Sequence, residues 1–210
     1  MKKTFIKIAL ISLISIGLFS CGNENEKPET PAENLKYQID TETISLKWTA
    51  YKTTEKKPVS GHFRKINIKE FTPAEKIENA IDQVSFSIPI SSLATGNESR
   101  DVKLVEKFFG IMDNTEFIKG TFNFGEGNNK NGNGVLDLTM NSETYGLPYE
   151  YTISNDSMFI SATMNIQDWK AENALDSLNV ACGILHQAAD GITKTWEDVE
   201  IKASVGIVRK

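Results

Sequence analysis

Apolar and polar residues alternate along most of the chain after Tyr37. Between residues 84 and 90, the apolar residues Val84, Phe86, Ile88 and Ile90 are separated by serines and a proline. This two-residue period is that of a half-buried β-strand. The same period recurs in the segments 44–50, 61–71, 117–124, 136–140, 145–153, 158–166 and 199–207, so the sequence predicts about eight amphipathic strands.

Two segments interrupt the alternation with helical spacing. In the first, Val102, Val105, Phe108 and Phe109 fall on one face of a short helix that follows a strand and a turn. The second spans residues 168–181 and is expected to pack on the sheet. A helix that lies across the end of a rolled sheet would close or gate an apolar cavity.

An antiparallel sheet with one polar face has to bury its other face, and about eight strands close naturally into a barrel. Residues 125–134 are rich in glycine and asparagine and predict a flexible hairpin loop between two strands. We find no internal repeat and no second domain in the sequence. The predicted fold is therefore an all-β, antiparallel eight-stranded barrel with two short helical insertions, formed by residues 36–210.

Residues 1–20 have the pattern of a secretory signal, with a basic start, an apolar run over residues 8–19 and Ser20 before the cut. This run is too short for an ordinary membrane-spanning helix. The cysteine that follows makes the segment resemble the lipobox of bacterial lipoproteins, in which Cys21 becomes the lipidated first residue. An ordinary signal peptide that happens to contain a cysteine is the alternative.

Residues 21–35 contain no large apolar residue before Leu35 and are predicted to be a flexible tether after the lipidated cysteine. Two or more acyl chains such as palmitate would hold the protein firmly on a membrane. Gly22 after the cysteine resembles the pattern sent to the outer membrane in many bacteria, which predicts a cell-envelope protein on the outer membrane facing the periplasm.

Signal removal takes away three of the 23 basic residues and none of the 28 acidic ones, which leaves a net charge of −8. An acidic chain without a basic run argues against nucleic acid as a partner and against electrostatic adhesion to anionic lipid. Attachment to the membrane would therefore depend on the acyl chains.

The sequence offers few groups for catalysis or metal binding. With Cys21 acylated, Cys182 is the one remaining thiol, so the fold has to be stable without an internal disulfide. Cys182 and His186 are four residues apart and could share a helical face, but two ligands do not make a zinc site. A small buried thiol beside a capping histidine is the simpler interpretation. We therefore predict no catalytic residues, no metal site and no cofactor other than a bound lipid.

Three groups of residues resemble the YceI-like family of lipocalin-like, polyisoprenoid-binding proteins of the bacterial envelope. They are 48–52 with 59–63, then 88–96 with Arg100-Asp101, Leu104 and Phe108-Phe109, and finally 134–139. The run from Thr95-Gly96 through Arg100-Asp101 to Phe108-Phe109 is the most specific. The lipobox and the excursion 169–196 resemble a lipoprotein subgroup. The resemblance implies a lipocalin-like barrel with a long apolar tunnel for an isoprenoid tail.

Candidate ligand-binding residues follow from this resemblance and from the alternation. The apolar residues predicted to line the tunnel are Trp48, Phe63, Phe86, Ile88, Phe108, Phe109, Phe117 and Leu138, although each could instead fill a solid core. Arg100 has two interpretations. In the structural interpretation, the Asp101 carboxylate stabilises the start of the helix through the helix dipole, and Arg100 pairs with an acidic neighbour. In the functional interpretation, Arg100 meets the head group of a ligand at the barrel mouth.

The expected function is binding of an isoprenoid-type lipid, a quinone or a similar amphiphile, for carriage, storage or protection. One alternative is a structural or interaction module whose barrel is filled solid. A further alternative is an enzyme that uses Cys182 and His186.

Overall fold

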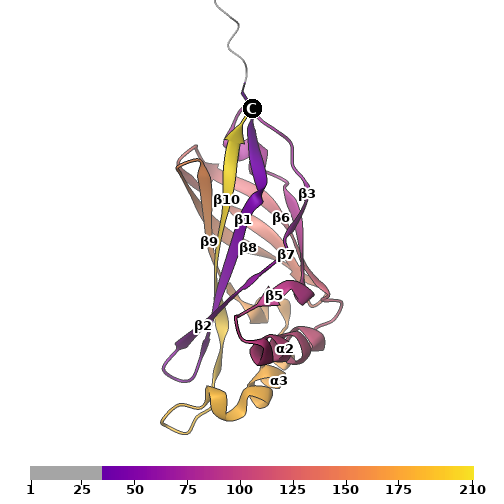
Figure 1. Cartoon of the computed structure of the whole chain (residues 1–210), viewed down its shortest axis with the longest axis vertical. Helices are drawn as coiled ribbons and strands as arrows, with labels where there is room; N and C mark the ends of the chain where they lie inside the picture. The colour runs from indigo at the N-terminus through magenta and orange to yellow at the C-terminus, as the bar shows by residue number, and fades with distance from the viewer. Residues whose placement is uncertain (1–34) are drawn as a thin grey trace, which may run out of the picture. The chain divides into compact units, whose positions relative to one another are not determined.

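The computed structural model describes residues 35–210, which lie in one compact unit (Figure 1). The predicted signal peptide, Cys21 and the predicted tether up to residue 34 lie outside the described residues. Among the helices of residues 35–210, none combines the length and the apolar character needed to cross a membrane.

Ten antiparallel strands form one curled sheet (Figure 1). Their order across the sheet is β3-β4-β6-β7-β8-β9-β10-β1-β2-β5. The strands are β1 (Tyr37–Lys52), β2 (Lys57–Phe63), β3 (Asn67–Glu70), β4 (Ser85–Pro89), β5 (Leu93–Ala94), β6 (Phe117–Gly127), β7 (Asn131–Met140), β8 (Glu143–Ser154), β9 (Ser157–Asn165) and β10 (Thr195–Arg209).

The difference between eight expected strands and ten observed ones has a local cause. The predicted strand 61–71 is broken at residues 64–66, so that β2 pairs with β1 whereas β3 pairs with β4. The remaining extra strand, β5, has only two residues and pairs with the end of β2. The chain between β2 and β3 therefore crosses from one side of the curled sheet to the other, between two edges that no ladder connects.

The segment 125–134 forms a hairpin, but its turn is much shorter than the sequence suggests. Phe124 pairs with Gly134 and Gly127 pairs with Gly132, so β6 and β7 continue almost to the tip. The side chain of Asn128 accepts the backbone N–H groups of residues 130 and 131 and closes the turn. Asparagine and glycine here serve a tight turn rather than a long flexible loop.

Three α-helices and four 3₁₀ turns complete the described part of the chain. The helices are α1 (Ile77–Ile81), α2 (Glu98–Lys107) and α3 (Glu172–Cys182), and the 3₁₀ turns are η1 (Ile90–Ser92), η2 (Phe109–Ile111), η3 (Ile166–Trp169) and η4 (Gly183–His186). α2 and α3 are the two predicted insertions, although Val102 on α2 is 48% exposed rather than packed on the sheet. Both helices lie at one end of the barrel (Figure 1).

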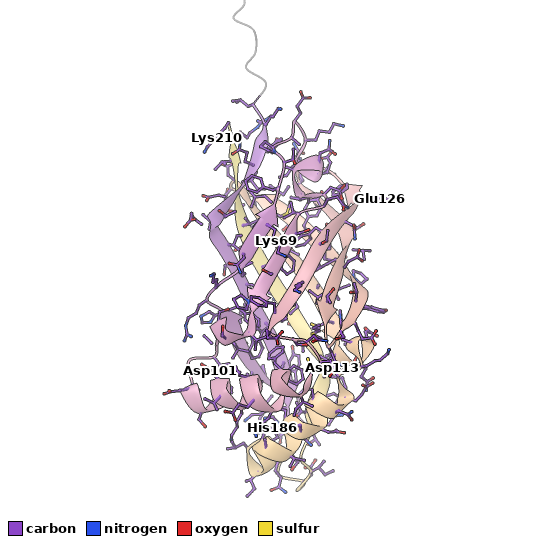
Figure 2. All side chains as sticks on the ribbon, turned by 90° about the vertical axis from the view of Figure 1, so that its right-hand side faces the viewer. Lys69, Asp101, Asp113, Glu126, His186 and Lys210 are labelled. Atoms are coloured by element: carbon purple, nitrogen blue, oxygen red, sulfur yellow. The ribbon has the colours of Figure 1, made fainter. Side chains whose placement is uncertain are left out.

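The two ends of the barrel differ in what covers them. At one, which we call the terminal end, the first and last described residues lie together, with Lys36 and Lys210 joined by backbone hydrogen bonds. At the other, the helix end, α2 and α3 cover the opening, and Figure 2 shows Asp101 and His186 there and Lys210 far away. The interior contains two apolar clusters, one around Phe86 and Leu138 and one around Tyr149 and Met158.

Aromatic side chains inside the barrel lie over glycines on the neighbouring strand. The directly paired partners are Trp48 with Gly61, Phe86 with Gly120, Tyr149 with Gly134, and Tyr151 with Gly132. At each of these glycines a Cβ atom would overlap the aromatic side chain opposite. Glycine is thus required by close approach, since it lets a large ring lie flat against the wall of a narrow barrel.

Candidate functional site

A cavity of about 150 Å³ lies inside the barrel at the helix end, and we call it the outer cavity. Its lining is apolar apart from Thr195 and the edges of the tryptophans. The strands contribute alternate residues such as Trp48 and Ile88, α2 and α3 contribute Leu104 and Leu178, and Phe108 lies just after α2. The regular inward alternation of the strands and the capping by α2 and α3 therefore leave an apolar space under the helices.

A second apolar cavity of about 110 Å³, the inner cavity, continues towards the terminal end. It is lined by residues such as Ile39, Tyr149 and Val205. Six residues line both cavities, namely Leu46, Phe86, Ile88, Leu136, Leu147 and Ile201. The two spaces are therefore neighbours along the barrel axis, separated only by side chains.

Seven of the eight residues that the sequence suggested as tunnel lining do line the outer cavity: Trp48, Phe63, Phe86, Ile88, Phe108, Phe109 and Leu138. Phe117 does not, because its side chain is 41% exposed on the other face of β6. Its neighbour Ile118 points inward instead. This placement corrects the prediction for Phe117, and the role of the other seven in ligand binding stays a prediction.

Sequence reasoning missed the contribution of the C-terminal excursion. Leu175 and Leu178 of α3 and Trp196 of β10 line the outer cavity together with the predicted aromatics. Leu175 and Leu178 are three residues apart in the predicted helix 168–181 and so share one face of it, which was the available signal. What that face would cover depends on how α3 packs against α2.

A third hollow of about 260 Å³, which we call the vestibule, lies at the helix end. Five of its lining residues also line the outer cavity: Trp48, Ala50, Leu104, Leu178 and Thr195. Unlike the two inner spaces, the vestibule contains charged side chains, namely Lys52 at the end of β1 and Arg100 and Lys103 on α2. No aspartate or glutamate is among its lining residues.

The contacts around Arg100 bear on whether it pairs with an acidic neighbour at the start of α2 or is free to meet a ligand. The α2 N-terminus is capped by Asn97, whose side chain accepts the backbone N–H of Arg100 at 2.9 Å. The Asp101 carboxylate accepts the N–H and the hydroxyl of Thr95, at 2.8 and 2.6 Å. Asp101 therefore serves the turn before the helix, whereas the Arg100 guanidinium takes part in none of the ion pairs found between residues 35 and 210.

His186 and Cys182 both line the vestibule, but they form no hydrogen bond with each other. His186 Nδ1 lies 2.6 Å from the Thr195 hydroxyl, and that hydroxyl donates to Asn179 Oδ1 at 2.9 Å. Because the only hydroxyl proton of Thr195 is used in this way, the His186 Nδ1 carries a proton and donates it. The ring is thus held by a chain of two hydrogen bonds.

The protonation of both groups follows from burial. Burial, with the nearby cations Lys52, Lys103 and Arg100, lowers the pKa of His186 to about 4. Burial raises the pKa of the Cys182 thiol, although the same three cations oppose that shift. Near neutral pH the pair is therefore a neutral thiol and a neutral imidazole, not the thiolate–imidazolium pair that a cysteine nucleophile uses.

An antiparallel barrel with an apolar interior and one covered opening defines this protein as lipocalin-like in architecture. The model of the YceI-like domain matches residues 37–206, so the chain belongs to the YceI-like family. No curated protein sequence matches it.

Several solved structures share the fold at low sequence identity. A polyisoprenoid binding domain from Saccharophagus degradans, implicated in plant cell wall breakdown, has a TM-score of 0.58 and 11% identity over 84% of this chain and 99% of that one. BcnA from Burkholderia cenocepacia has a TM-score of 0.54 and 12% identity over 81% and 99%. The YceI protein of Campylobacter jejuni has a TM-score of 0.50 and 16% identity over 72% and 85%. Identities this low show the shared fold alone.

Proposed function

We propose that this protein is a membrane-anchored envelope lipoprotein that binds an isoprenoid-type lipid or a similar amphiphile, such as a quinone, in its barrel. Its task would be carriage, storage or protection of that lipid. The observation that carries this proposal is the pair of adjoining apolar cavities inside the sheet. The fold similarity to a polyisoprenoid binding domain supports it.

The size of the cavities suggests how a ligand would be held. A dry protein cavity of ~150 Å³ is large enough for benzene, so each cavity has room for about one five-carbon isoprene unit. At ~0.8 kcal/mol per buried CH₂-sized group, one unit contributes about 4 kcal/mol. Two units would then contribute about 8 kcal/mol, which the cost of association reduces substantially. A longer tail requires interior side chains to move, and contacts to the head group would matter for affinity.

The cellular setting rests on the N-terminal sequence. A lipobox-like segment before Cys21 and the tether after it support anchoring by acyl chains at the outer membrane, facing the periplasm. Incorporation of radiolabelled palmitate into the wild-type protein, and its loss in Cys21→Ser, tests this part independently of ligand binding. Labelling that persists in Cys21→Ser would contradict it.

Binding rather than catalysis is the proposed activity. The support is that the vestibule contains a thiol that is neutral near pH 7 and a histidine whose Nδ1 is hydrogen-bonded to Thr195 and not to that thiol. A screen for turnover with and without alkylation of Cys182 checks this point. Turnover that disappears on alkylation would favour an enzyme instead.

The direct experiment is to purify residues 21–210 carrying Cys21→Ser from a host rich in isoprenoid lipids. Organic extracts of the protein are then analysed by mass spectrometry. We expect a stoichiometric isoprenoid or quinone, and its yield should fall when Ala50→Phe narrows the outer cavity. An extract without any lipid, from well-folded protein, would contradict the proposal.

The second candidate function is a structural or interaction module with a filled barrel. The modest volume of the cavities favours it, because Phe86 and the other shared residues occupy much of the interior. Titration with isoprenoid alcohols of increasing length separates the two candidates. A binding protein should gain affinity with added isoprene units, whereas a filled barrel should bind none of them.

A further inference from the structure

We infer that the segment at the end of α3, together with the loop that follows it, is a membrane-contact surface that inserts aliphatic side chains into a bilayer with anionic head groups. This surface, which we call the apolar tip, consists of Val180, Ile184, Leu185 and Ile192. The inference goes beyond the proposed function, because it concerns the outside of the protein and does not require the barrel to hold a ligand.

The first observation is that these four aliphatic side chains are exposed although they are close together in the chain. Each of them is at least 55% exposed, and Val180 and Ile184 are 83% and 85% exposed. Residues 35–210 contain 24 acidic and 19 basic side chains, about one residue in four, but Asp190 is the only such residue between positions 180 and 193. A cluster of exposed apolar side chains marks a surface that another molecule or a membrane covers.

The second observation is that hydrogen bonds hold the tip in this arrangement. The Asp190 carboxylate accepts the Thr54 hydroxyl at 2.6 Å and the backbone N–H of Ile192 at 2.9 Å. The Gln187 side chain donates to the Gly191 carbonyl at 2.6 Å. Because these polar side chains bond within the protein, the aliphatic side chain of Ile192 is the one left facing outward.

The third observation is that the barrel uses only one side of α3. Leu178 is buried and lines the outer cavity, whereas Val180, two residues later, lies on the opposite side of the helix. In Figure 1 the end of α3 and the loop before β10 form the extremity of the molecule opposite the terminal end. Figure 2 shows His186, next to Leu185, remote from Lys210. The packing of the domain therefore does not account for the apolar tip.

The size and position of the tip favour a bilayer over a second copy of the chain or another protein. A stable protein interface takes about 20–30 residues from each side, and the tip offers four aliphatic side chains at a protruding end. A fluid bilayer accommodates a small protrusion without a matching partner surface, and insertion strengthens with the apolar area that is buried.

The charges beside the tip favour anionic head groups. Leu185 lines the vestibule together with Lys52, Arg100 and Lys103, and Lys52 Nζ donates to the Leu185 carbonyl at 2.9 Å. None of the three cations takes part in the five ion pairs of residues 35–210. Cations at the level of the head groups add attraction to an inserted apolar surface. The acidic excess of the rest of the domain opposes this attraction, so the contact is reversible and the tip approaches first.

The test measures flotation of residues 21–210 carrying Cys21→Ser with lipid vesicles, since this substitution removes the predicted acyl anchor. One vesicle preparation contains equal parts of phosphatidylcholine and phosphatidylglycerol, and the other contains phosphatidylcholine alone. We expect binding to the anionic vesicles at least about tenfold stronger than to the neutral ones, and added salt should reduce the difference.

The double variant Ile184→Ser with Leu185→Ser should lower binding to the anionic vesicles about tenfold or more, because it removes two inserted side chains. Phe159→Ser is the matched control, since Phe159 is an exposed apolar residue on β9, outside the tip. It should leave binding unchanged. Near-ultraviolet circular dichroism confirms that each variant is folded.

The contribution of charge is tested separately. Arg100→Gln combined with Lys103→Gln should lower binding to the anionic vesicles and leave the weak binding to neutral vesicles unchanged. Lys107→Gln is the control, because Lys107 lies on the same helix and is absent from the vestibule lining. An equal loss in both variants would mean that net charge alone decides binding, and it would overturn the assignment of the three cations to the contact.

Insertion is measured with a tryptophan placed in the tip. In Ile184→Trp, the added fluorescence relative to the parent should be quenched by lipids that carry bromine on their acyl chains. In Phe159→Trp it should not be quenched. This measurement tests the inference even where the double serine variant does not fold.

Several outcomes would overturn the inference. They are no binding to anionic vesicles, equal binding to both kinds of vesicle, full binding by the double serine variant, or no quenching in Ile184→Trp. A dimer in sedimentation velocity that Ile184→Ser with Leu185→Ser dissociates would make a second copy the occupant instead. None of these results depends on the lipid content of the barrel, which the extraction experiment measures, so the two proposals fail separately.

Discussion

The terminal end and the helix end of the barrel are built from the same strands but close in different ways. At the terminal end, β1 pairs with β10 as far as Tyr37 and Arg209, and Ile77 and Ile81 of α1 are buried in the cluster around Tyr149. At the helix end, the covering elements are α2 and α3, which leave the larger apolar cavity and a hollow lined by cations.

This contrast shows which end of the barrel leaves more space and more charge around its apolar interior. An interior filled to normal density gains the most stability and has no room for a ligand. The terminal end comes closer to that condition, since Tyr149, Tyr151 and Met158 are almost fully buried and the inner cavity there is the smaller of the two, at about 110 Å³. The helix end retains space and unpaired charge, which cost stability, and this is why we place the binding function there.

The largest expected effect tests whether the helix end is also a site of strong packing. Trp169 is fully buried, and its Nε1 donates to the Leu138 carbonyl at 2.8 Å. We expect Trp169→Ala to lower the free energy of unfolding by about 3–5 kcal/mol through loss of buried area and the cavity left behind. Trp169→Phe, which keeps most of the ring but not the hydrogen bond, should cost less, about 1–3 kcal/mol.

Urea denaturation of both variants measures these losses. Met158→Ala at the terminal end is the comparison, because Met158 is 1% exposed and its truncation should cost about 2–5 kcal/mol. A negligible loss for Trp169→Ala would mean that the helix end is loosely packed throughout. The two ends of the barrel would then differ in stability as well as in the chemistry of their lining.

The next effect concerns ligand affinity. Ala50 lines both the vestibule and the outer cavity, so Ala50→Phe should fill the passage between them and weaken an isoprenoid ligand about 100-fold, or ~2.7 kcal/mol. Thr49→Phe on the opposite face of β1 is the control and should leave the affinity unchanged. Calorimetry with farnesol measures both.

The same substitution at the terminal end sharpens the comparison. Ala203 lines the inner cavity, so Ala203→Phe should spare a ligand with a short tail and weaken only ligands long enough to pass Phe86. Equal losses for short and long tails would show that the ligand occupies the inner cavity first, and the assignment of function to the helix end would have to be reversed.

A smaller effect is expected from the glycines that face aromatic rings. A Cβ at Gly61 would overlap the Trp48 ring at the mouth, and one at Gly120 would overlap Phe86 between the two cavities. We expect Gly61→Ala and Gly120→Ala each to cost about 1–3 kcal/mol by overpacking. Gly96→Ala is no suitable control because its φ is +74°. Gly110→Ala is the comparison without an aromatic ring: its Cβ would lie 3.1 Å from the backbone oxygen of Val105 and 4.0 Å from the carbonyl carbon, so a small backbone shift is expected there as well.

Thermal unfolding, with near-ultraviolet circular dichroism of the tryptophans, follows these variants. Gly61→Ala should alter the Trp48 signal, and Gly120→Ala should leave it unchanged. If Gly61→Ala is as stable as the parent with the same spectrum, the Trp48 ring can move aside freely, and the mouth is more plastic than the structure indicates.

The last expected effect is a dependence of stability on pH. The pKa of His186 is about 4 in the folded protein, below its ordinary value of 6.5. The unfolded chain therefore takes up a proton at this residue before the folded chain does. The stability linked to His186 is fully present above about pH 6.5 and is lost as the pH falls towards about 4.

Urea midpoints measured across this range should show a shallower slope for His186→Gln than for the parent. An identical slope in the two proteins would mean that the folded His186 titrates normally, so that neither its burial nor the nearby cations lower its pKa as the structure indicates. High salt should reduce the slope difference, since it screens Lys52, Arg100 and Lys103.

The sequence determined the strands and their inward faces. Strict alternation in residues 84–90, 136–140 and 199–207 left one apolar face that had to be buried, and the observed interior uses those faces. The inward face of the segment 117–124 was ambiguous, because the adjacent residues Phe117 and Ile118 are both apolar and point to opposite faces of the strand. Pairing of β6 with β4 and β7 decided in favour of Ile118, and Phe117 was left outside.

The composition and charge of the vestibule were determined only by the tertiary structure. Lys52, Arg100 and His186 are separated by about 50 to more than 80 residues in the chain, and nothing in their local sequence relates them. They meet because β1 ends where α2 and η4 cover the barrel. Alternation specifies local burial, but the charge of a pocket depends on which distant segments are brought together by strand pairing and helix packing.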